Sequence, residues 1–124
     1  MTEQKQLQVT DLLQGTGKTA VKGALITAHY TGYLDDGSIF DSSVQRGRPF
    51  ECVIGTGRVI KGWDLGVLGF DNDMGKVAAM QVGGKRQLKV PSHLAYGERS
   101  MGKITPHSDL TFEIELFDVK TRDE

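Results

Sequence analysis

The residue types that usually carry covalent or metal-dependent chemistry are few in this chain, and they are not spaced for it. The sequence has three histidines, His29, His93 and His107, and one cysteine, Cys52. Zinc sites usually place two ligands within a few residues of each other and two more further along, and no such spacing occurs here. No histidine lies in a recognisable nucleophile motif with Cys52 or a serine. The sequence therefore predicts no metal site, no covalent catalysis and no cofactor.

Two short motifs resemble known ligand loops, and both lack an essential residue. Gly17-Lys18-Thr19 looks like the end of a phosphate-binding loop, but that loop needs a glycine where Leu12 stands. Asp71-Asn72-Asp73 with Gly75 looks like the start of a calcium loop, but Val82 occupies the position of the bidentate glutamate. Neither segment is expected to bind its ligand.

Aromatic side chains are the most unusual feature of the sequence. They lie on predicted strands or on the predicted helix, on or near the apolar faces: Tyr30, Phe40, Phe50, Trp63 and Phe112. Such rings can pack together as a core, or they can line an apolar pocket. Taken alone, their positions leave both interpretations open.

The elements that would position these rings are mostly short strands. The even positions between residues 24 and 31 form one apolar face that includes Tyr30. Residues 110–116 give the clearest alternation in the chain, with Phe112 on the apolar side. Residues 59–68 repeat apolar side chains at three- and four-residue spacing, which predicts one short helix. The predicted class is α+β, an antiparallel sheet folded against that helix.

The length indicates a single domain over residues 1–124, with a short flexible N-terminus over about residues 1–6. The 15 basic residues nearly cancel the 16 acidic ones, so neither nucleic acid nor a membrane is an expected partner. No apolar run approaches the roughly 18 residues needed to cross a bilayer, and the N-terminus lacks the features of a signal peptide. Together with the unpaired Cys52, these features predict a cytoplasmic protein.

Six blocks of sequence follow one another in order between about Gln8 and Val119. They are Ala28-His29-Tyr30-Thr31-Gly32, Asp36-Gly37 with Phe40-Asp41-Ser42-Ser43, Pro49-Phe50, Gly57 with Val59-Ile60-Lys61-Gly62-Trp63-Asp64, Ala95-Tyr96-Gly97, and Pro106-His107 with Leu110-Thr111-Phe112. In these blocks the chain resembles the FKBP family, the macrolide-binding prolyl isomerases. The resemblance implies a five- to six-stranded antiparallel β-sheet curled around one short α-helix.

The resemblance also implies which residues form a pocket. The implied catalytic residues are Tyr30, Asp41, Tyr96 and Phe112. The implied substrate-binding residues are Phe40, Phe50, Val59, Ile60, Trp63 and Ile104. In the family pattern the aspartate pairs with an arginine, here Arg46. Without the resemblance, Asp41 before two serines would be interpreted as a turn residue that caps its own loop.

By the same resemblance the chain is a peptidyl-prolyl cis-trans isomerase, or rotamase, that assists protein folding. Its expected partners are proline-containing polypeptides and macrolide ligands such as tacrolimus or rapamycin. The alternative is a chaperone or adaptor that holds proline-containing segments with little catalysis. Relatives specialised for holding unfolded chains carry a large apolar insertion after the Ala-Tyr-Gly motif, and this chain has only a short loop there.

The chain departs from the family pattern in two places. The loop from Gly97 to Pro106 is one residue short, and Ile104 is the match to its remaining apolar contact. An extra stretch of about ten residues, near positions 70–79, lies between the helix and the strand that begins at Lys85. This stretch is expected to form a surface loop without an assigned function.

Overall fold

The computed structural model describes residues 5–73 and 75–122. Its strands are β1 (Gln8–Leu13), β2 (Leu25–Tyr33), β3 (Ile39–Ser42), β4 (Phe50–Val53), β5 (Phe70–Asn72), β6 (Gly75–Val77), β7 (Lys85–Val90) and β8 (Leu110–Lys120), and its helical segments are α1 (Ser43–Arg46), α2 (Lys61–Leu68) and η1 (Ser92–Leu94). The predicted flexible segment over residues 1–6 falls mainly on residues 1–4, which lie outside the described residues. Among the residues described, no helix has the length and apolar character required to span a membrane.

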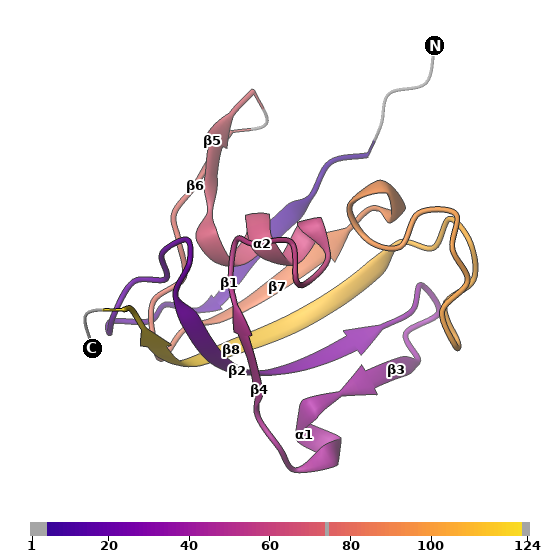
Figure 1. Cartoon of the computed structure of the whole chain (residues 1–124). Coiled ribbons are helices and arrows are strands. Elements are labelled where there is room, and N and C mark those ends of the chain that lie inside the picture. The colour runs from indigo at the N-terminus through magenta and orange to yellow at the C-terminus, as the bar shows by residue number, and fades with distance from the viewer. Residues whose placement is uncertain (1–4, 74, 123–124) are drawn as a thin grey trace.

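One antiparallel sheet of six strands forms the body of the molecule (Figure 1). Its order is β1-β7-β8-β2-β3, and β4 pairs with β2 as well. β3 pairs with residues 31–33 of β2 and β4 pairs with residues 25–28, so the two short strands follow one another along one edge of β2. β8 takes the other edge over the whole length of β2. The predicted class, a five- to six-stranded antiparallel sheet around one short helix, is confirmed.

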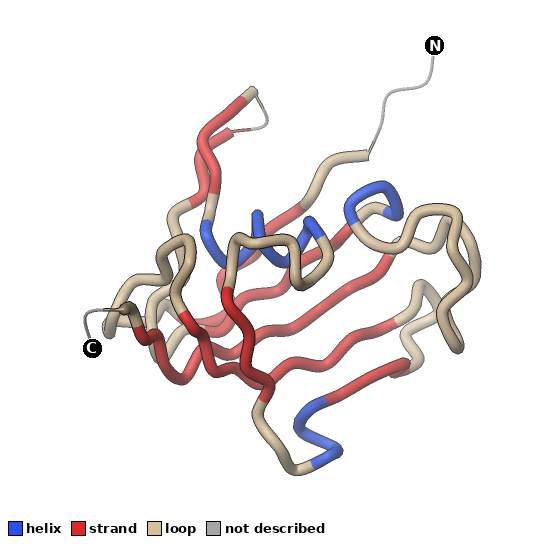
Figure 2. Tube along the Cα trace, viewed as in Figure 1, coloured by secondary structure: helices blue, strands red, loops and turns tan. Residues whose placement is uncertain are grey.

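The helix α2 lies across one face of this sheet (Figures 1 and 2). Strand alternation places Ile26, Leu88 and Ile114 on that face, where all three are fully buried. The helix contributes Trp63 and Val67, which are also buried. A helix of eight residues is too short to be stable in water by itself, so it depends on this packing.

Two glycines allow α2 to approach β7 closely. A Cβ on Gly62 would lie 2.4 Å from Val90 Cγ1, and a Cβ on Gly66 would lie 2.5 Å from both Cδ atoms of Leu88. In a helix each glycine costs about 1 kcal/mol relative to alanine. The close approach explains why these two positions hold glycine despite that cost.

The segment after β3 differs from its sequence prediction. The polar residues that follow Asp41-Ser42-Ser43, up to Pro49, predict a loop, whereas Ser43–Arg46 form the helical turn α1. The Ser42 side chain caps this turn by accepting a hydrogen bond from Gln45 N at 3.2 Å, and Gly47 ends it with a φ of 69°. A single capped turn has no apolar periodicity, so the pattern of the sequence does not show it.

The extra stretch near residues 70–79 contains a two-stranded hairpin that projects from the end of α2 (Figure 1). β5 and β6 pair antiparallel, with Phe70 opposite Val77 and Asn72 opposite Gly75. The acidic residues that resemble the start of a calcium loop thus belong to this hairpin. Phe70 and Val77, at its base, are half-buried.

A buried arginine joins the two layers of the fold. Arg86 lies on the inner face of β7, and its side chain is only 2% exposed. Its Nε donates a hydrogen bond to Asp11 Oδ1 at 2.7 Å, and its Nη1 donates to the carbonyls of Gly66 and Ala78 at 2.9 and 2.8 Å. The Gly66 carbonyl belongs to the last turn of α2, where the helix offers no donor of its own. Arg86 therefore links β1, the end of α2 and the segment after the hairpin.

We expect Gly62→Ala and Gly66→Ala each to lower the free energy of unfolding by about 1–3 kcal/mol, because the added methyl group overlaps a β7 side chain. Helix propensity alone predicts the opposite sign, a gain of about 1 kcal/mol. Chemical denaturation measures the change, with Lys61→Ala on the exposed side of the same helix as the control. A glycine variant more stable than the original protein would show that α2 can move away from β7 at no cost.

We expect Arg86→Met to be strongly destabilising, by about 1–3 kcal/mol for each buried carbonyl left without a donor. The matched control is Lys85→Met, because Lys85 is the neighbouring residue on the outer face of β7 and its ion pair with Glu113 is long and exposed. That control should lose less than about 1 kcal/mol. Thermal denaturation of the two variants compares them, and equal losses would contradict the role given to Arg86.

Candidate active site

The aromatic side chains come from separate elements and meet on the side of the sheet that faces α2. Strand alternation places Tyr30 on the same face as the buried Ala28, and Phe112 on the same face as the buried Ile114. The rings and their elements are Tyr30 in β2, Phe40 in β3, Phe50 in β4, Trp63 in α2 and Phe112 in β8. Residues far apart in the sequence thus form one cluster.

A glycine in β2 makes room for two of these rings. Gly32 lies opposite Phe112 in the register of β2 and β8. A Cβ at Gly32 would lie 2.5 Å from the ring of Phe40 and 3.1 Å from the ring of Phe112. Because that side chain is absent, the Phe40 and Phe112 rings meet edge to face, with centroids 5.7 Å apart.

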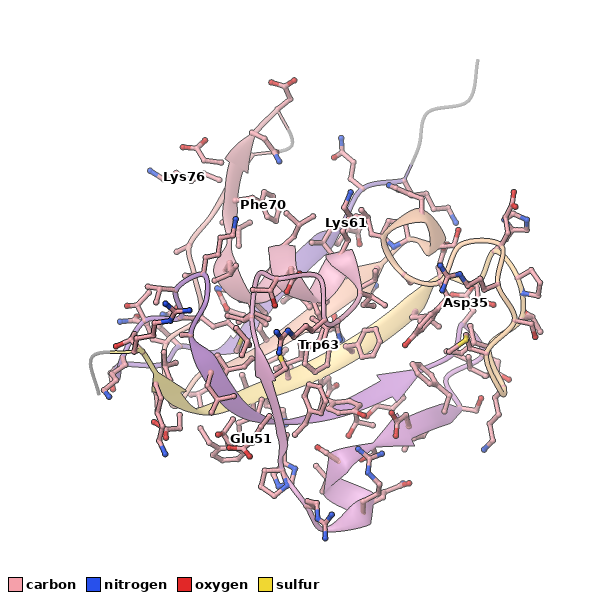
Figure 3. All side chains as sticks on the ribbon, in the orientation of Figure 1. Asp35, Glu51, Lys61, Trp63, Phe70 and Lys76 are labelled. Carbon is pink, nitrogen blue, oxygen red and sulfur yellow. The ribbon has the colours of Figure 1, made fainter. Side chains whose placement is uncertain are left out.

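Trp63 lies at the centre of the cluster, between α2 and the sheet (Figure 3). Its ring centroid is 5.1 Å from that of Tyr30 and 5.7 Å from those of Phe50 and Phe112. All three contacts are close to perpendicular, an arrangement favoured by the ring quadrupoles. Trp63 is only 4% exposed and forms the floor on which the other rings stand.

The rings do not fill the space between them. They enclose a cavity of about 220 Å³, which is lined by Tyr30, Phe40, Asp41, Phe50, Arg58, Val59, Ile60, Trp63, Tyr96 and Phe112. Sites for drug-sized ligands usually measure roughly 300–1,000 Å³, so this cavity suits a group of side-chain size. The vacancy decides between the two interpretations of the aromatic residues, in favour of a pocket.

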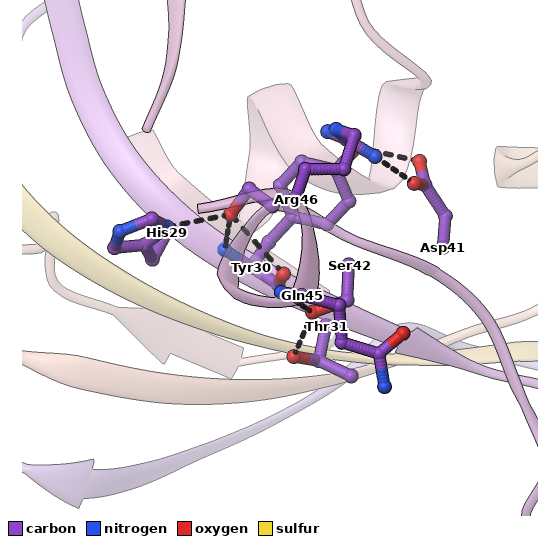
Figure 4. Close-up of polar contacts among 8 residues, drawn as sticks. His29, Tyr30, Thr31, Asp41, Ser42, Gln45 and Arg46 are labelled. Carbon is purple, nitrogen blue, oxygen red and sulfur yellow. Dashed lines mark hydrogen bonds and ion pairs between the residues drawn. The ribbon is translucent and has the colours of Figure 1, made fainter. Parts of the chain in front are cut away.

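A polar group adjoins the rings on one wall (Figure 4). The Tyr30 hydroxyl donates a hydrogen bond to Asp41 Oδ2 at 2.5 Å. Arg46 forms an ion pair with Asp41 through Nη1, and its Nη2 donates to the Tyr30 hydroxyl at 3.1 Å. The helical turn α1 places Arg46 there. The pairing of Asp41 with Arg46 implied by the resemblance is therefore present.

The backbone beneath Tyr30 is held by a buried serine (Figure 4). Ser43, at the start of α1, is fully buried, and its Oγ accepts a hydrogen bond from Tyr30 N at 2.8 Å. The same hydroxyl lies 2.8 Å from His29 Nδ1. These bonds fasten α1 to β2, so the elements that carry Arg46 and Tyr30 are held together.

Burial keeps the two tyrosines of the cavity protonated. It raises the pKa of the Tyr30 phenol above its ordinary value, and the hydrogen bond to Asp41 raises it further, while Arg46 opposes the shift. Burial is also the main cause of the raised pKa of Tyr96, with a smaller contribution from the Asp41 charge. Both hydroxyls are therefore neutral donors at physiological pH. The Tyr30 hydroxyl donates its hydrogen bond to Asp41, whereas the Tyr96 hydroxyl has no hydrogen-bond acceptor among the described residues.

A carboxylate shapes the segment that leads into α2. Asp64 accepts hydrogen bonds from Gly55 N at 2.7 Å and Gly57 N at 3.1 Å, which folds this segment back over the helix. Val59 and Ile60 reach the cavity as a result. The Ile60 carbonyl begins the helix by accepting from Trp63 N at 3.0 Å. Within residues 5–73 and 75–122 the Ile60 amide has no acceptor, so it is free to bind a ligand.

The structure brings together all the predicted pocket residues except Ile104. That side chain is 5% exposed and packs in the hydrophobic core, and it does not line the cavity. Its backbone pairs with Met101 in a tight turn, which turns Ile104 inward. Arg58, by contrast, lines the cavity although no pattern in the sequence predicted it there. The only available signal was its position immediately before Val59.

The cavity contains aromatic rings, two tyrosine hydroxyls, one free backbone amide and an ion pair. In the described part of the chain, no group of three or more His, Cys, Asp or Glu side chains is placed to hold a metal ion. Burial raises the pKa of the Cys52 thiol to about 11, so this thiol is protonated at neutral pH. The residues present are suited to binding an apolar group and orienting a carbonyl beside it.

Comparison with known proteins agrees with this geometry. The family model for FKBP-type peptidyl-prolyl cis-trans isomerases matches residues 16–117. An "FK506-binding protein" of Neisseria meningitidis serogroup A is 48% identical over 114 residues, which cover 91% of this chain and 95% of that protein. The chloroplastic "Peptidyl-prolyl cis-trans isomerase FKBP13" of Arabidopsis thaliana is 49% identical over 115 residues, which cover 88% of this chain and 53% of that protein.

Two solved structures share the fold. The crystal structure of AtFKBP13 has a TM-score of 0.84 and 47% sequence identity, and the match covers 93% of each chain. FkpA from Escherichia coli has a TM-score of 0.75 and 34% identity, and the match covers 92% of this chain and 48% of that one. On its sequence, its fold and its aromatic cavity, the chain belongs to the FKBP-type peptidyl-prolyl cis-trans isomerases.

Proposed function

We propose that the aromatic cavity is the place where this isomerase binds the proline of an Xaa-Pro bond and lowers the barrier to its rotation. The observation that carries the proposal is the vacancy of about 220 Å³ above Trp63, bordered by two donors without acceptors among the described residues, Ile60 N and the Tyr96 hydroxyl. A proline ring needs an apolar hollow of side-chain size, and the peptide on either side of it needs hydrogen-bond partners. The cavity supplies both.

The reaction itself explains why such residues suffice. The two isomers of an Xaa-Pro bond differ by only about 0.5–1 kcal/mol, whereas the barrier between them is about 18–20 kcal/mol. No covalent bond breaks. Twisting the amide removes its resonance and with it the partial charges on oxygen and nitrogen, so the twisted form is less dipolar than the planar one. A cavity poor in water therefore favours the twisted form relative to bulk solvent.

The aromatic residues have the role of gripping the ring. Trp63 lies beneath it, and Phe50 and Phe112 contact Trp63 from two sides at centroid distances of 5.7 Å. With the ring held, the carbonyl on its amino side is the part that rotates. Ile60 N and the Tyr96 hydroxyl would anchor the peptide by donating hydrogen bonds to its carbonyl oxygens.

The polar wall has the role of shaping the field around the rotating carbonyl. Asp41 is held by Tyr30 and Arg46, so its charge has a fixed position beside the cavity. A million-fold acceleration requires roughly 8 kcal/mol, and one neutral hydrogen bond contributes on the order of 1 kcal/mol. Contacts to the proline ring, exclusion of water and the fixed electrostatic field must therefore each lower part of the barrier. Phe40 completes the wall of the cavity on this side.

Proline-containing polypeptides are accordingly the proposed substrates, and assistance to protein folding is the proposed use. Macrolide ligands such as tacrolimus or rapamycin are proposed to enter the same cavity, since several relatives are named FK506-binding proteins. A holding chaperone with little catalysis is not favoured, because relatives of this chain are named isomerases. A cytoplasmic location of the protein stays a prediction, based in part on the unpaired Cys52.

We expect Trp63→Leu and Phe112→Leu to lower kcat/KM by more than about ten-fold, because a truncated wall admits water and loosens the grip on the ring. Tyr96→Phe should lose only about five-fold, which corresponds to one hydrogen bond of about 1 kcal/mol. Isomerisation of an Xaa-Pro peptide is followed for the three variants after circular dichroism has shown that each is folded. A larger loss for Tyr96→Phe than for the other two would overturn the assignment of roles.

We expect a macrolide or a small pipecolyl ligand to change the fluorescence of Trp63 in a saturable way. Trp63 is the only tryptophan of the chain, so the signal reports directly on the floor of the cavity. The same ligand should inhibit isomerisation over the same concentration range. Binding that leaves the peptide reaction unaffected would show that ligand and substrate use different sites.

A further inference from the structure

A second hollow lies at the end of the sheet where β8 ends. It is a groove of about 750 Å³, formed by residues 21–25 leading into β2, by the end of β4 and the segment after it, and by residues 120–122 at and after the end of β8. The strand register explains why these segments meet. Leu25 of β2 pairs with Val53 of β4 on one side and with Lys120 of β8 on the other.

The charges of this groove all have one sign. Lys22, Arg58, Lys120 and Arg122 line it, and none of the lining residues within the described ranges 5–73 and 75–122 is an aspartate or glutamate. The chain as a whole has a net charge of −1, so this is a local concentration of positive charge. Exposed apolar side chains line the same groove, including Val21, which is 46% exposed.

These cations are poorly compensated by the protein itself. Within residues 5–73 and 75–122, Lys22, Arg58 and Arg122 form no ion pair, and Lys120 reaches Asp118 only at 4.0 Å. The stem of Lys22 packs where Gly55 lacks a side chain, since a Cβ on Gly55 would lie 2.9 Å from Lys22 Cγ. Lys22 is thus held beside the segment that carries Arg58.

Another large groove carries charges of both signs. It lies along β7 and β8 with a volume of about 760 Å³, and Lys5 and Lys89 line it together with Asp35, Asp109 and Glu113. Lys5 is already paired with Asp109 at 2.7 Å. Mixed and paired charges of this kind give no preference for an anion.

Arg58 connects the basic groove to the aromatic cavity, because it lines both. It immediately precedes Val59 and Ile60, which form the rim of the cavity. A peptide whose proline occupies the cavity therefore has the basic groove within reach of its flanking residues. An extended chain advances about 3.3–3.6 Å per residue, so a short flanking segment is enough.

We propose that the basic groove binds a carboxylate-bearing segment of the client chain, so that this isomerase prefers prolines flanked by acidic sequence. This inference rests on the proposed function of the cavity and adds the class of substrate. Arg58 determines specificity at the junction, and Lys22, Lys120 and Arg122 extend the attraction along the groove. Opposite charges attract the client over a longer range than the apolar contacts of the cavity do.

The test uses peptides with one Xaa-Pro centre and either three glutamates or three glutamines beside it. One pair carries them on the amino side of the proline and a second pair on the carboxyl side. Exchange NMR measures kcat/KM without a coupling protease. We expect kcat/KM at low salt to be about five-fold higher for the glutamate peptide than for the glutamine peptide in at least one pair. A difference of this size is what two or three exposed ion pairs together contribute. The preference should vanish at about 1 M salt, where the Debye length is about 3 Å.

Charge variants locate the effect. Lys22→Gln combined with Lys120→Gln removes two of the four cations of the groove and should lower the preference from about five-fold to about two-fold. Lys76→Gln combined with Lys89→Gln, which removes the same charge elsewhere, should preserve the five-fold preference. Equal effects of the two double variants would overturn the proposal, and so would the absence of any preference on an enzyme that isomerises the glutamine peptides. Failure to isomerise even those peptides would instead reject the proposed function. A preference seen only in D123N/E124Q would assign the groove to the chain's own acidic residues and also overturn the proposal.

Discussion

The close approach of α2 to β7 is the constraint on which the site depends. At Gly62 and Gly66 the helix backbone lies so close to Val90 and Leu88 that a methyl group would not fit between them. That depth places Trp63 in edge contact with rings on three strands, at centroid distances of 5.1–5.7 Å. A helix displaced outward by one methyl diameter would open these contacts, and the cavity would lose its floor. The helix is too short to hold this position unaided, so the sheet and the helix stabilise one another.

Polar groups at the two ends of α2 determine where it lies. At its start, Asp64 binds Gly55 N and Gly57 N and thereby sets the path of the segment that carries Val59 and Ile60. At its end, Arg86 binds the Gly66 carbonyl from beneath. Arg86 is buried and Asp64 is partly buried. Such charges add little net stability, because losing their hydration offsets much of the attraction. They instead fix the position of the helix, since the hydrogen bonds of Asp64 and Arg86 form only in this arrangement of helix and sheet.

The sequence predicted the elements whose apolar side chains recur at regular spacing. Alternation identified β2 and β8, three- and four-residue spacing identified α2, and the ordered blocks led to the pocket. It could not predict features that depend on a single contact made after folding. The turn α1 rests on one cap from Ser42, Arg86 is buried only because three acceptors surround it, and Arg58 reaches the cavity because Asp64 bends the preceding segment. Ile104 was misplaced for the same reason: its turn with Met101 directs the side chain into the core.

The proposed function implies that selectivity among substrates arises outside the cavity. If the hollow of about 220 Å³ receives the proline ring, which every substrate shares, its walls cannot distinguish one client from another. Differences between clients begin at the rim. There the charges of Asp41 and Arg46 offset each other through their ion pair, whereas Arg58 has no ion-pair partner among the described residues. The electrostatic field at the mouth of the cavity is therefore set largely by Arg58 and by the basic groove behind it. A client with negative charge on that side is attracted to the protein before its proline reaches the rings.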